Sequence, residues 1–166
     1  MGKIMTLLIV GINHRLKQSK ILLETEEKAK EIANLQGGIC GLKKLLDYLL
    51  ELFSSICAIT YIDEEEKEII IEKISTAQIN ELYKELTELI ETSEWKELLK
   101  RTQDNREKLK EMLFSQADCA RDLYLAQAQQ DGLTYFNYLL GRVQDEYSRR
   151  EEELTFDDGA ENEVEE

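Results

Sequence analysis

The sequence predicts a mainly α protein of α+β type, in which long amphipathic helices form a helical bundle beside a small antiparallel β element. Two observations lead to this fold class. The 166 residues include no proline, so no helix is interrupted by a missing backbone N–H group. Apolar residues also recur at intervals of three and four along most of the chain, which places them on one face of a helix.

The first expected element is a strand at residues 4–10. This short apolar run ends at Gly11, and its length and the terminating glycine favour a strand over the first turn of a helix. Residues 5–15, MTLLIVGINHR, are similar to the N-terminal start of glutamyl-tRNA reductases, where a first strand leads into a GINH-type turn. The similarity implies a strand at residues 5–10, and it carries neither a function nor a site residue to this chain.

Two helices are expected next. Residues 19–35 have apolar side chains at mostly helical spacing, and Gly37 after them is typical of a helix C-terminus. A second helix starts near Ile39 and is the most hydrophobic of the chain, so we expect it at the centre of the core. Its apolar positions are Leu42, Leu45, Leu46, Leu49, Leu52, Phe53 and Ile56.

The β element is predicted between these helices and the C-terminal ones. Residues 57–62 and 68–73 are rich in isoleucine, which fits a pleated surface better than a helix, and the acidic residues 63–66 would form the turn. The alternative is one helix with charge in the middle of its apolar stripe. A hairpin is favoured, and residues 4–10 could add the third strand that gives such a hairpin stability.

The rest of the chain is predicted to be helical. Ser75 and Gln78 form a capping-box pattern before the helical spacing of residues 79–90, the clearest helix in the sequence. Ser93 can cap the next helix. Its apolar stripe lapses across residues 100–108, which indicates either a fresh helix start or an exposed segment of one long helix.

After this lapse the stripe resumes from Leu109 to Ala128 and stops at Gly132, and a final helix starts near Thr134. Long one-sided helices bury their stripe against another helix, as in bundles and coiled coils, within the chain or in a partner. The predicted division is residues 1–74 with the β element, residues 75–153 with the C-terminal helices, and a disordered acidic tail at residues 154–166.

Charge is distributed unevenly along the chain, whose net charge is −14. Residues 1–60 carry eight Lys or Arg against six Asp or Glu, whereas residues 61–166 carry thirteen against twenty-nine. Such acidity opposes binding to nucleic-acid phosphates. The uncharged runs are too short for a transmembrane helix, and no secretory signal is recognised, so we expect no membrane association and a cytoplasmic location. Cys40, Cys57 and Cys119 are expected to be reduced and mostly buried.

Little in the sequence indicates catalysis. His14 is the single histidine, so a histidine-based triad or a multi-histidine metal site is excluded within one copy of the chain. The most phosphate-like feature is GGICGLKK at residues 37–44, because glycines at a helix start leave backbone N–H groups that can hold an anion. It lacks the P-loop pattern and is more typical of a turn between two helices. We therefore expect no catalytic, metal or cofactor-binding residues.

The function predicted from these features is that of a non-catalytic interaction or assembly protein that acts through helix packing and an acidic surface. It would form a homo-oligomer or bind a larger protein partner, and no nucleic-acid or small-molecule ligand is expected. An alternative is an acidic inhibitor or nucleic-acid mimic of a basic partner, and a third is a phosphate-ligand enzyme using residues 37–44. Aromatic side chains are enriched at interfaces, so the candidate partner-binding residues are Trp95, Tyr124, Tyr135, Phe136 and Tyr138.

Overall fold

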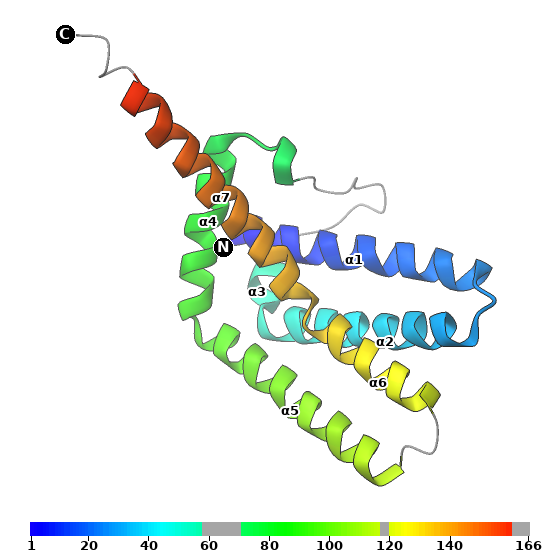
Figure 1. The fold of residues 1–166 in the computed structure, drawn as a ribbon. Helices are drawn as coiled ribbons and strands as arrows, with labels where there is room; N and C mark the ends of the chain where they lie inside the picture. The colour runs from blue at the N-terminus through cyan, green and yellow to red at the C-terminus, as the bar shows by residue number, and fades with distance from the viewer. Residues whose placement is uncertain (58–70, 117–119, 161–166) are drawn as a thin grey trace.

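The structure, a computed structural model, describes residues 1–57, 71–116 and 120–160, and within these ranges it contains helices and no strand. A helical bundle is confirmed (Figure 1). α1 and α2 lie side by side as an antiparallel pair, α4 and α7 pack together at one end of this pair, and the C-terminal end of α7 projects from the body. The elements are α1 (Gly2–Thr25), α2 (Ala29–Leu52), α3 (Ser54–Cys57), η1 (Ile71–Lys73), α4 (Thr76–Glu91), α5 (Ser93–Gln116), α6 (Ala120–Leu133) and α7 (Tyr135–Ala160).

The predicted strand at residues 4–10 is wrong, because these residues belong to α1. All of them except Thr6 are buried, so this part of the helix has no solvent-facing polar side and therefore no helical periodicity in its sequence. Gly11 does not end the helix either. The predicted strand at residues 57–62 lies outside the described residues apart from its first position, and residues 71–73 form a 3₁₀ turn instead of the end of a strand.

The helix predicted at residues 19–35 is interrupted in the structure. Glu26 and Lys28 have extended backbone angles, with ψ of 132° and 122°, and separate α1 from α2. The Glu26 carboxylate accepts hydrogen bonds of 3.0 Å from the backbone N–H groups of Glu27 and Lys28. A side chain thus satisfies the backbone N–H groups at this break. The sequence has no glycine or proline here that would predict the end of a helix.

The second predicted helix corresponds to the second half of α2, which begins at Ala29 rather than near Ile39. Its side chains at Leu42, Leu45 and Leu49 are buried in the core, as is Phe53 at its C-terminal end. The predicted turn at residues 37–44 is wrong, however, because α2 runs without interruption through this stretch.

The glycines of this stretch lie where α2 crosses α6, the most extensive contact between two helices of the described chain. A Cβ atom at Gly41 would overlap the carbonyl oxygen of Gln129 and lie 2.8 Å from the backbone nitrogen of Leu133. A Cβ atom on Gly132 of α6 would lie 2.5 Å from the carbonyl oxygen of Gly38. The glycines therefore allow the two backbones to touch, the packing that small residues four apart make possible.

The start of α4 confirms the predicted capping box. Ser75 Oγ accepts a hydrogen bond of 3.3 Å from the backbone N–H of Gln78, and the Gln78 side chain accepts one of 3.0 Å from the backbone N–H of Ser75. At the start of α5 the cap is Thr92 rather than Ser93, because Thr92 Oγ1 accepts a hydrogen bond from the backbone N–H of Trp95. α5 is one continuous helix across residues 100–108.

The core lies where α1, α2, α4 and α7 meet, and polar groups hold their ends together. Glu85 on α4 accepts a hydrogen bond of 2.9 Å from the backbone N–H of Ile4, so it satisfies one of the donors that the first turn of α1 leaves open. Beside it, Lys3 forms an ion pair with Glu81.

α7 continues as a helix through Ala160, within the range predicted as a disordered tail, while residues 161–166 lie outside the described part.

Candidate functional site

Two of the five aromatic residues predicted to contact a partner belong to the core instead. Trp95 on α5 and Phe136 on α7 are buried, and their rings meet edge to face with centroids 5.2 Å apart and an interplanar angle of 83°. This contact fixes the start of α5 against the start of α7. Neither ring is available to a partner in this arrangement, because each fills the interior of the bundle.

The other three are half-buried or exposed. Tyr124 on α6 lies beneath Lys30, whose Nζ atom is 4.9 Å from the ring centroid. Tyr135 and Tyr138 on α7 stack with centroids 5.4 Å apart, and Tyr138 is 54% exposed. These two tyrosines lie together at one place, while Tyr124 lies on a different helix.

The paired tyrosines form one side of a pocket of about 50 Å³ between α1 and α7, here called the α1–α7 pocket. His14 of α1 and Arg142 of α7 also line it, and both are half-buried. The guanidinium carbon of Arg142 lies 5.8 Å from the centroid of the Tyr138 ring, a cation–π distance. The single histidine of the chain is thus brought close to an arginine and two phenols.

Part of the lining of this pocket is apolar and buried. It consists of Leu7 from α1, Ile71 from η1 and Leu139 from α7. Gly11 also lies there, and a Cβ atom on it would come within 2.8 Å of the Leu139 side chain, so the absence of a side chain lets the two helices approach at this level. The lining of the α1–α7 pocket therefore combines buried apolar side chains with polar groups.

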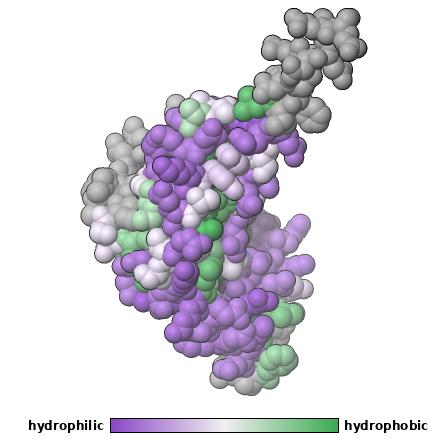
Figure 2. All heavy atoms as spheres, turned by 90° about the vertical axis from the view of Figure 1, so that its left-hand side faces the viewer, coloured by the Kyte–Doolittle hydropathy of each residue, from purple (hydrophilic) through white to green (hydrophobic). Residues whose placement is uncertain are grey.

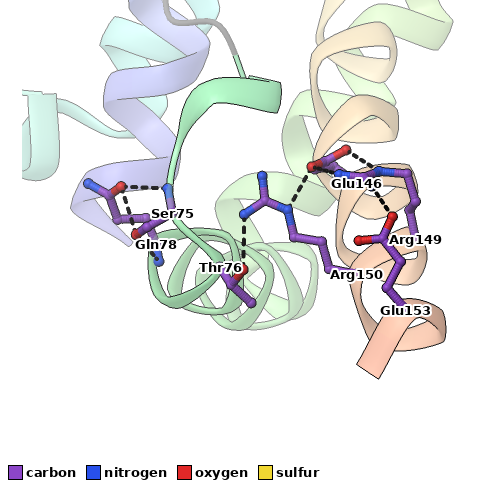
Figure 3. A network of polar contacts seen from close by, with 7 residues as sticks. All are labelled: Ser75, Thr76, Gln78, Glu146, Arg149, Arg150 and Glu153. Carbon is purple, nitrogen blue, oxygen red and sulfur yellow. Dashed lines mark hydrogen bonds and ion pairs between the residues drawn. The ribbon is translucent and has the colours of Figure 1, made fainter. Parts of the chain in front are cut away.

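A second polar cluster joins α7 to the start of α4 (Figure 3). The carboxylate of Glu146 is buried and accepts hydrogen bonds of 2.6 Å and 3.0 Å from Arg149 and one of 2.6 Å from Arg150. Arg150 extends the cluster to α4 through a contact of 3.4 Å with Thr76 Oγ1. The hydrogen bonds from Arg149 and then Arg150 lower the pKa of Glu146 to about 2, against the opposing effect of burial.

This cluster has the features of a structural contact and not of a reactive site. Both carboxylate oxygens of Glu146 are occupied by guanidinium groups, and its lowered pKa keeps it ionised at neutral pH. A carboxylate held in this way cannot serve as a general acid, and its lone pairs are directed at its own arginines.

The half of α5 beyond Asn105, residues 106–116 and here called the outer half of α5, presents apolar side chains to solvent. Phe114 is 92% exposed and Met112 is 42% exposed, and Leu123 at the start of α6 is 49% exposed. Figure 2 shows apolar atoms at the lower end of the molecule, where α5 ends, next to a largely hydrophilic surface. Among the residues of this half whose burial is described, only Leu109 and Leu113 are half-buried, and the others are exposed.

The inner half of α5 is, by contrast, anchored to the body. Arg101 forms ion pairs with Glu51 of α2 at 2.9 Å and with Glu97 at 3.0 Å, and its guanidinium carbon lies 5.7 Å from the Tyr48 ring. Thr102 and Asn105 on the same helix are buried. The helix is therefore held along its first half, and this attachment places the outer half in solvent.

Other kinds of site find little support in the described residues. Their His, Cys, Asp and Glu side chains form no group of three that could hold a metal ion. None of the helices in the described ranges combines the length and the apolar character that crossing a bilayer requires. The N–H groups of residues 37–44 lie inside α2 and Gly37 and Gly41 are packed on α6, so the anion cradle considered for this stretch is not formed. Cys40, in the same stretch, is exposed rather than buried.

Sequence reasoning missed the α1–α7 pocket and the outer half of α5. His14 and Arg142 are far apart in sequence and no pattern links them, so only the packing of α1 on α7 reveals the pocket. Phe114 could have been found, because it is an aromatic residue that falls off the helical stripe formed by Leu109 and Met112. Comparison of the chain with protein-family models, with curated proteins and with solved structures finds no match.

Proposed function

We propose that this chain is a non-catalytic interaction or assembly protein that works through helix packing and an acidic surface, either as a homo-oligomer or bound to a larger protein. The observation that carries the proposal is the outer half of α5, which displays Phe114 and Met112 to water beyond the half that is anchored by ion pairs to α2. A partner that packs around this half of the helix would remove these apolar side chains from water.

The energetics favour a partner at this place. A helical segment with few tertiary contacts is marginally stable in water, because packing of an apolar face supplies most of the stability of a helix in a protein. Phe114, Met112 and Leu123 are all at least two-fifths exposed, and burying each of them against a partner would contribute about 1–3 kcal/mol. Charged residues Arg106, Lys108 and Glu111 beside them provide the polar rim that interfaces use for specificity.

The test is a light-scattering measurement of mass across a concentration series, combined with a pull-down from the native host. The wild-type chain is expected to form an oligomer at micromolar concentration or to recover a protein partner. The double variant Met112→Ser, Phe114→Ser is expected to lose either association while it keeps its helical circular dichroism. Ile90→Ser on α4 is the matched control, since Ile90 is 41% exposed and lies on another helix.

A wild-type chain that stays monomeric and recovers no partner would contradict the proposal. So would a double variant that associates as the wild type does, because the outer half of α5 would then have no role. If the Ile90→Ser control also loses association, the effect is due to general destabilisation of the fold. The outer half of α5 would then not be the interaction surface.

A second candidate function is that of an acidic inhibitor or nucleic-acid mimic that binds a basic partner. It is favoured by the end of α7, which projects from the body in Figure 1 and whose residues 151–154 are exposed and include three glutamates. The residues from 148 to 166 carry nine acidic side chains against two arginines. A projecting helix with an excess of acidic residues offers negative charge to a basic surface, and here Arg149 neutralises only Glu153 in part.

This second function predicts salt-sensitive binding to a basic protein. The measurement is affinity for a lysine-rich polypeptide at low and at moderate salt, for the wild type and for a variant with the acids after residue 150 changed to Gln or Asn. Binding should weaken steeply with salt and in the variant. Equal binding by both proteins would remove this function and leave the first untouched, since the outer half of α5 is unchanged.

A further inference from the structure

We infer that the projecting end of α7 docks on helix α1 of a second copy of this chain. The docking segment is residues 151–154, here called the acidic end of α7, and its acceptor is formed by Lys17, Lys20 and Ile21, here called the basic face of α1. The inference rests on the proposed function and deepens it, because it assigns a partner to the acidic surface. It uses no residue of the outer half of α5.

The basic face of α1 is a positively charged surface in a chain of net charge −14. Lys20 and Ile21 follow Lys17 by three and four positions, so the three side chains are neighbours on the helix, and all of them are exposed. Ile21 is 55% exposed. Among the described residues neither lysine has an ion-pair partner, and Glu24 is the single acid of α1 against four basic residues. The two ammonium groups are therefore available to an acidic partner.

The acidic end of α7 presents an apolar side chain among carboxylates. Arg150, four positions before Leu154, contacts Thr76 at the start of α4, so Leu154 lies on the side by which α7 packs but one turn beyond that contact. Leu154 is 55% exposed, and the three glutamates at 151–153 are exposed as well. Arg149 neutralises one of them in part. The side of α7 that packs on the body thus continues into solvent at Leu154.

The two surfaces are complementary in their chemistry. Each presents one exposed aliphatic side chain, Ile21 or Leu154, beside charges of a single sign, and the two signs are opposite. Apolar contact removes both side chains from water, while the flanking charges select the partner and its orientation. In Figure 1 the second half of α1 and the projecting end of α7 lie on opposite sides of the body, so they do not meet within one copy. A second copy brings them together.

Such a contact is head to tail, because it joins different surfaces of the two copies. Each dimer keeps one unused basic face and one unused acidic end, so further copies add in the same way. A contact between two helices over one or two turns is smaller than about 1,200 Å², the class of weak and transient complexes. We therefore expect association at about 100 μM rather than at about 1 μM, and we expect salt to weaken it.

The experiment is sedimentation velocity of the full chain with Met112→Ser and Phe114→Ser, which removes the association proposed for the outer half of α5. This reference protein is measured from about 1 to about 300 μM, at about 20 mM and about 500 mM sodium chloride. Its average mass is expected to rise with concentration at low salt and to stay near that of the monomer at high salt.

Charge reversal then tests the pairing of the two surfaces in this reference protein. Lys17→Glu with Lys20→Glu reverses the basic face of α1, and Glu152→Lys with Glu153→Lys reverses the acidic end of α7. Each variant alone is expected to stay monomeric because like charges then oppose each other. An equimolar mixture should associate again, since each copy offers the charge that the other lacks. This recovery also excludes misfolding of either variant as the cause of the loss.

Two further variants separate charge and apolar contact from general effects. Lys84→Glu with Lys100→Glu is the matched control, because it changes two exposed lysines on α4 and α5 and alters the net charge equally. It should associate as the reference protein does. Leu154→Ser should weaken the association at least about fivefold, as the burial of an aliphatic side chain predicts.

A reference protein that stays monomeric at the highest concentration would overturn the inference, and so would a mixture as monomeric as its components or a control that loses association. Association of the wild type at about 1 μM would in these cases still support the outer half of α5. Conversely, a wild type that is monomeric at about 1 μM and recovers no partner, together with association of the mixture, would reject the outer half of α5 and support this contact.

Discussion

The rings of Tyr83 on α4 and Tyr147 on α7 lie face to face, with centroids 3.8 Å apart and planes inclined by 3°. Both rings are half-buried, and the contact lies on the same two helices that the Glu146 cluster connects. Burial, followed by the charge of Glu151, raises the pKa of Tyr147 above its usual value, so the ring stays neutral at physiological pH. The α4–α7 contact thus combines an aromatic stack with a hydrogen bond from the Glu146 cluster to Thr76.

A double-mutant cycle on Tyr83→Ala and Tyr147→Ala should reveal a coupling energy of about 0.5–1.5 kcal/mol, the range for aromatic pairs. The coupling arises because either single variant already removes the stack, so the second change costs less. Urea unfolding of the four proteins measures it. A cycle between Tyr83→Ala and Tyr124→Ala, which lies on α6 rather than on either helix of this ring pair, should be additive within about 0.5 kcal/mol.

Glu146→Gln should lower the free energy of unfolding at pH 7 by about 1–3 kcal/mol, because it removes charge-assisted hydrogen bonds to Arg149 and Arg150. The pKa of Glu146 in the folded state is about 2, below the ordinary value of 4.5. The stability that its charge contributes is therefore present above pH 4.5 and is lost as the pH falls towards 2.

The difference in stability between wild type and Glu146→Gln should accordingly shrink between these two pH values. Glu153→Gln is the matched control, because Glu153 is an exposed partner of Arg149 and its ion pair should contribute less than about 1 kcal/mol. A difference that stays constant with pH would show that the charge of Glu146 is not the cause of its effect.

Gly41→Ala should destabilise the chain by about 1–3 kcal/mol or more, because the added methyl group would overlap the backbone of α6 at Gln129. Gly38→Ala is the control on the same helix, where a Cβ atom meets nothing within 4 Å. It should stabilise the chain by about 0.5–1 kcal/mol through the higher helix propensity of alanine. Thermal unfolding of both variants measures the contrast, and two shifts of the same sign would contradict the α2–α6 contact.

Amide hydrogens should exchange faster in residues 106–114 than in residues 94–102, because the first half of α5 is anchored and the outer half has few packing contacts. If the outer half of α5 is the interface of a homo-oligomer, its exchange should slow as the protein concentration rises. Hydrogen exchange followed by mass spectrometry at two concentrations measures both effects, with residues 76–91 of α4 as the internal reference.

Local chemistry made some of the fold predictable. The side chains of Ser75 and Gln78 each accept a hydrogen bond from the backbone N–H group of the other residue, within one helical turn. The capping box and the helix after it could therefore be recognised without tertiary information. The repeating leucines likewise predict the second half of α2, where Leu42, Leu45 and Leu49 are buried. In both cases the sequence pattern and the burial have the same period, which is what makes such predictions succeed.

The predictions are wrong where contacts between distant parts of the chain determine the local structure. Residues 4–10 are buried on nearly all sides, which removes the polar positions that would have revealed helical periodicity. Gly37 was interpreted as a helix end because glycine is common there, whereas its actual use depends on a helix that is distant in the sequence. The pocket formed by His14 and Arg142 could not be predicted for the same reason, since it exists only once α1 and α7 have packed.

The glycines at the α2–α6 crossing also determine how the two helices tolerate insertions. An extra residue between Gly38 and Gly41 would rotate the following part of α2 by about 100°, which would turn a side chain instead of Gly41 towards the backbone of α6. Sliding α6 by a turn is no remedy, because Gly132 must stay opposite Gly38. The crossing therefore sets one axial register for α6, and through its direct connection to α7 it also sets the position of Arg142 relative to His14.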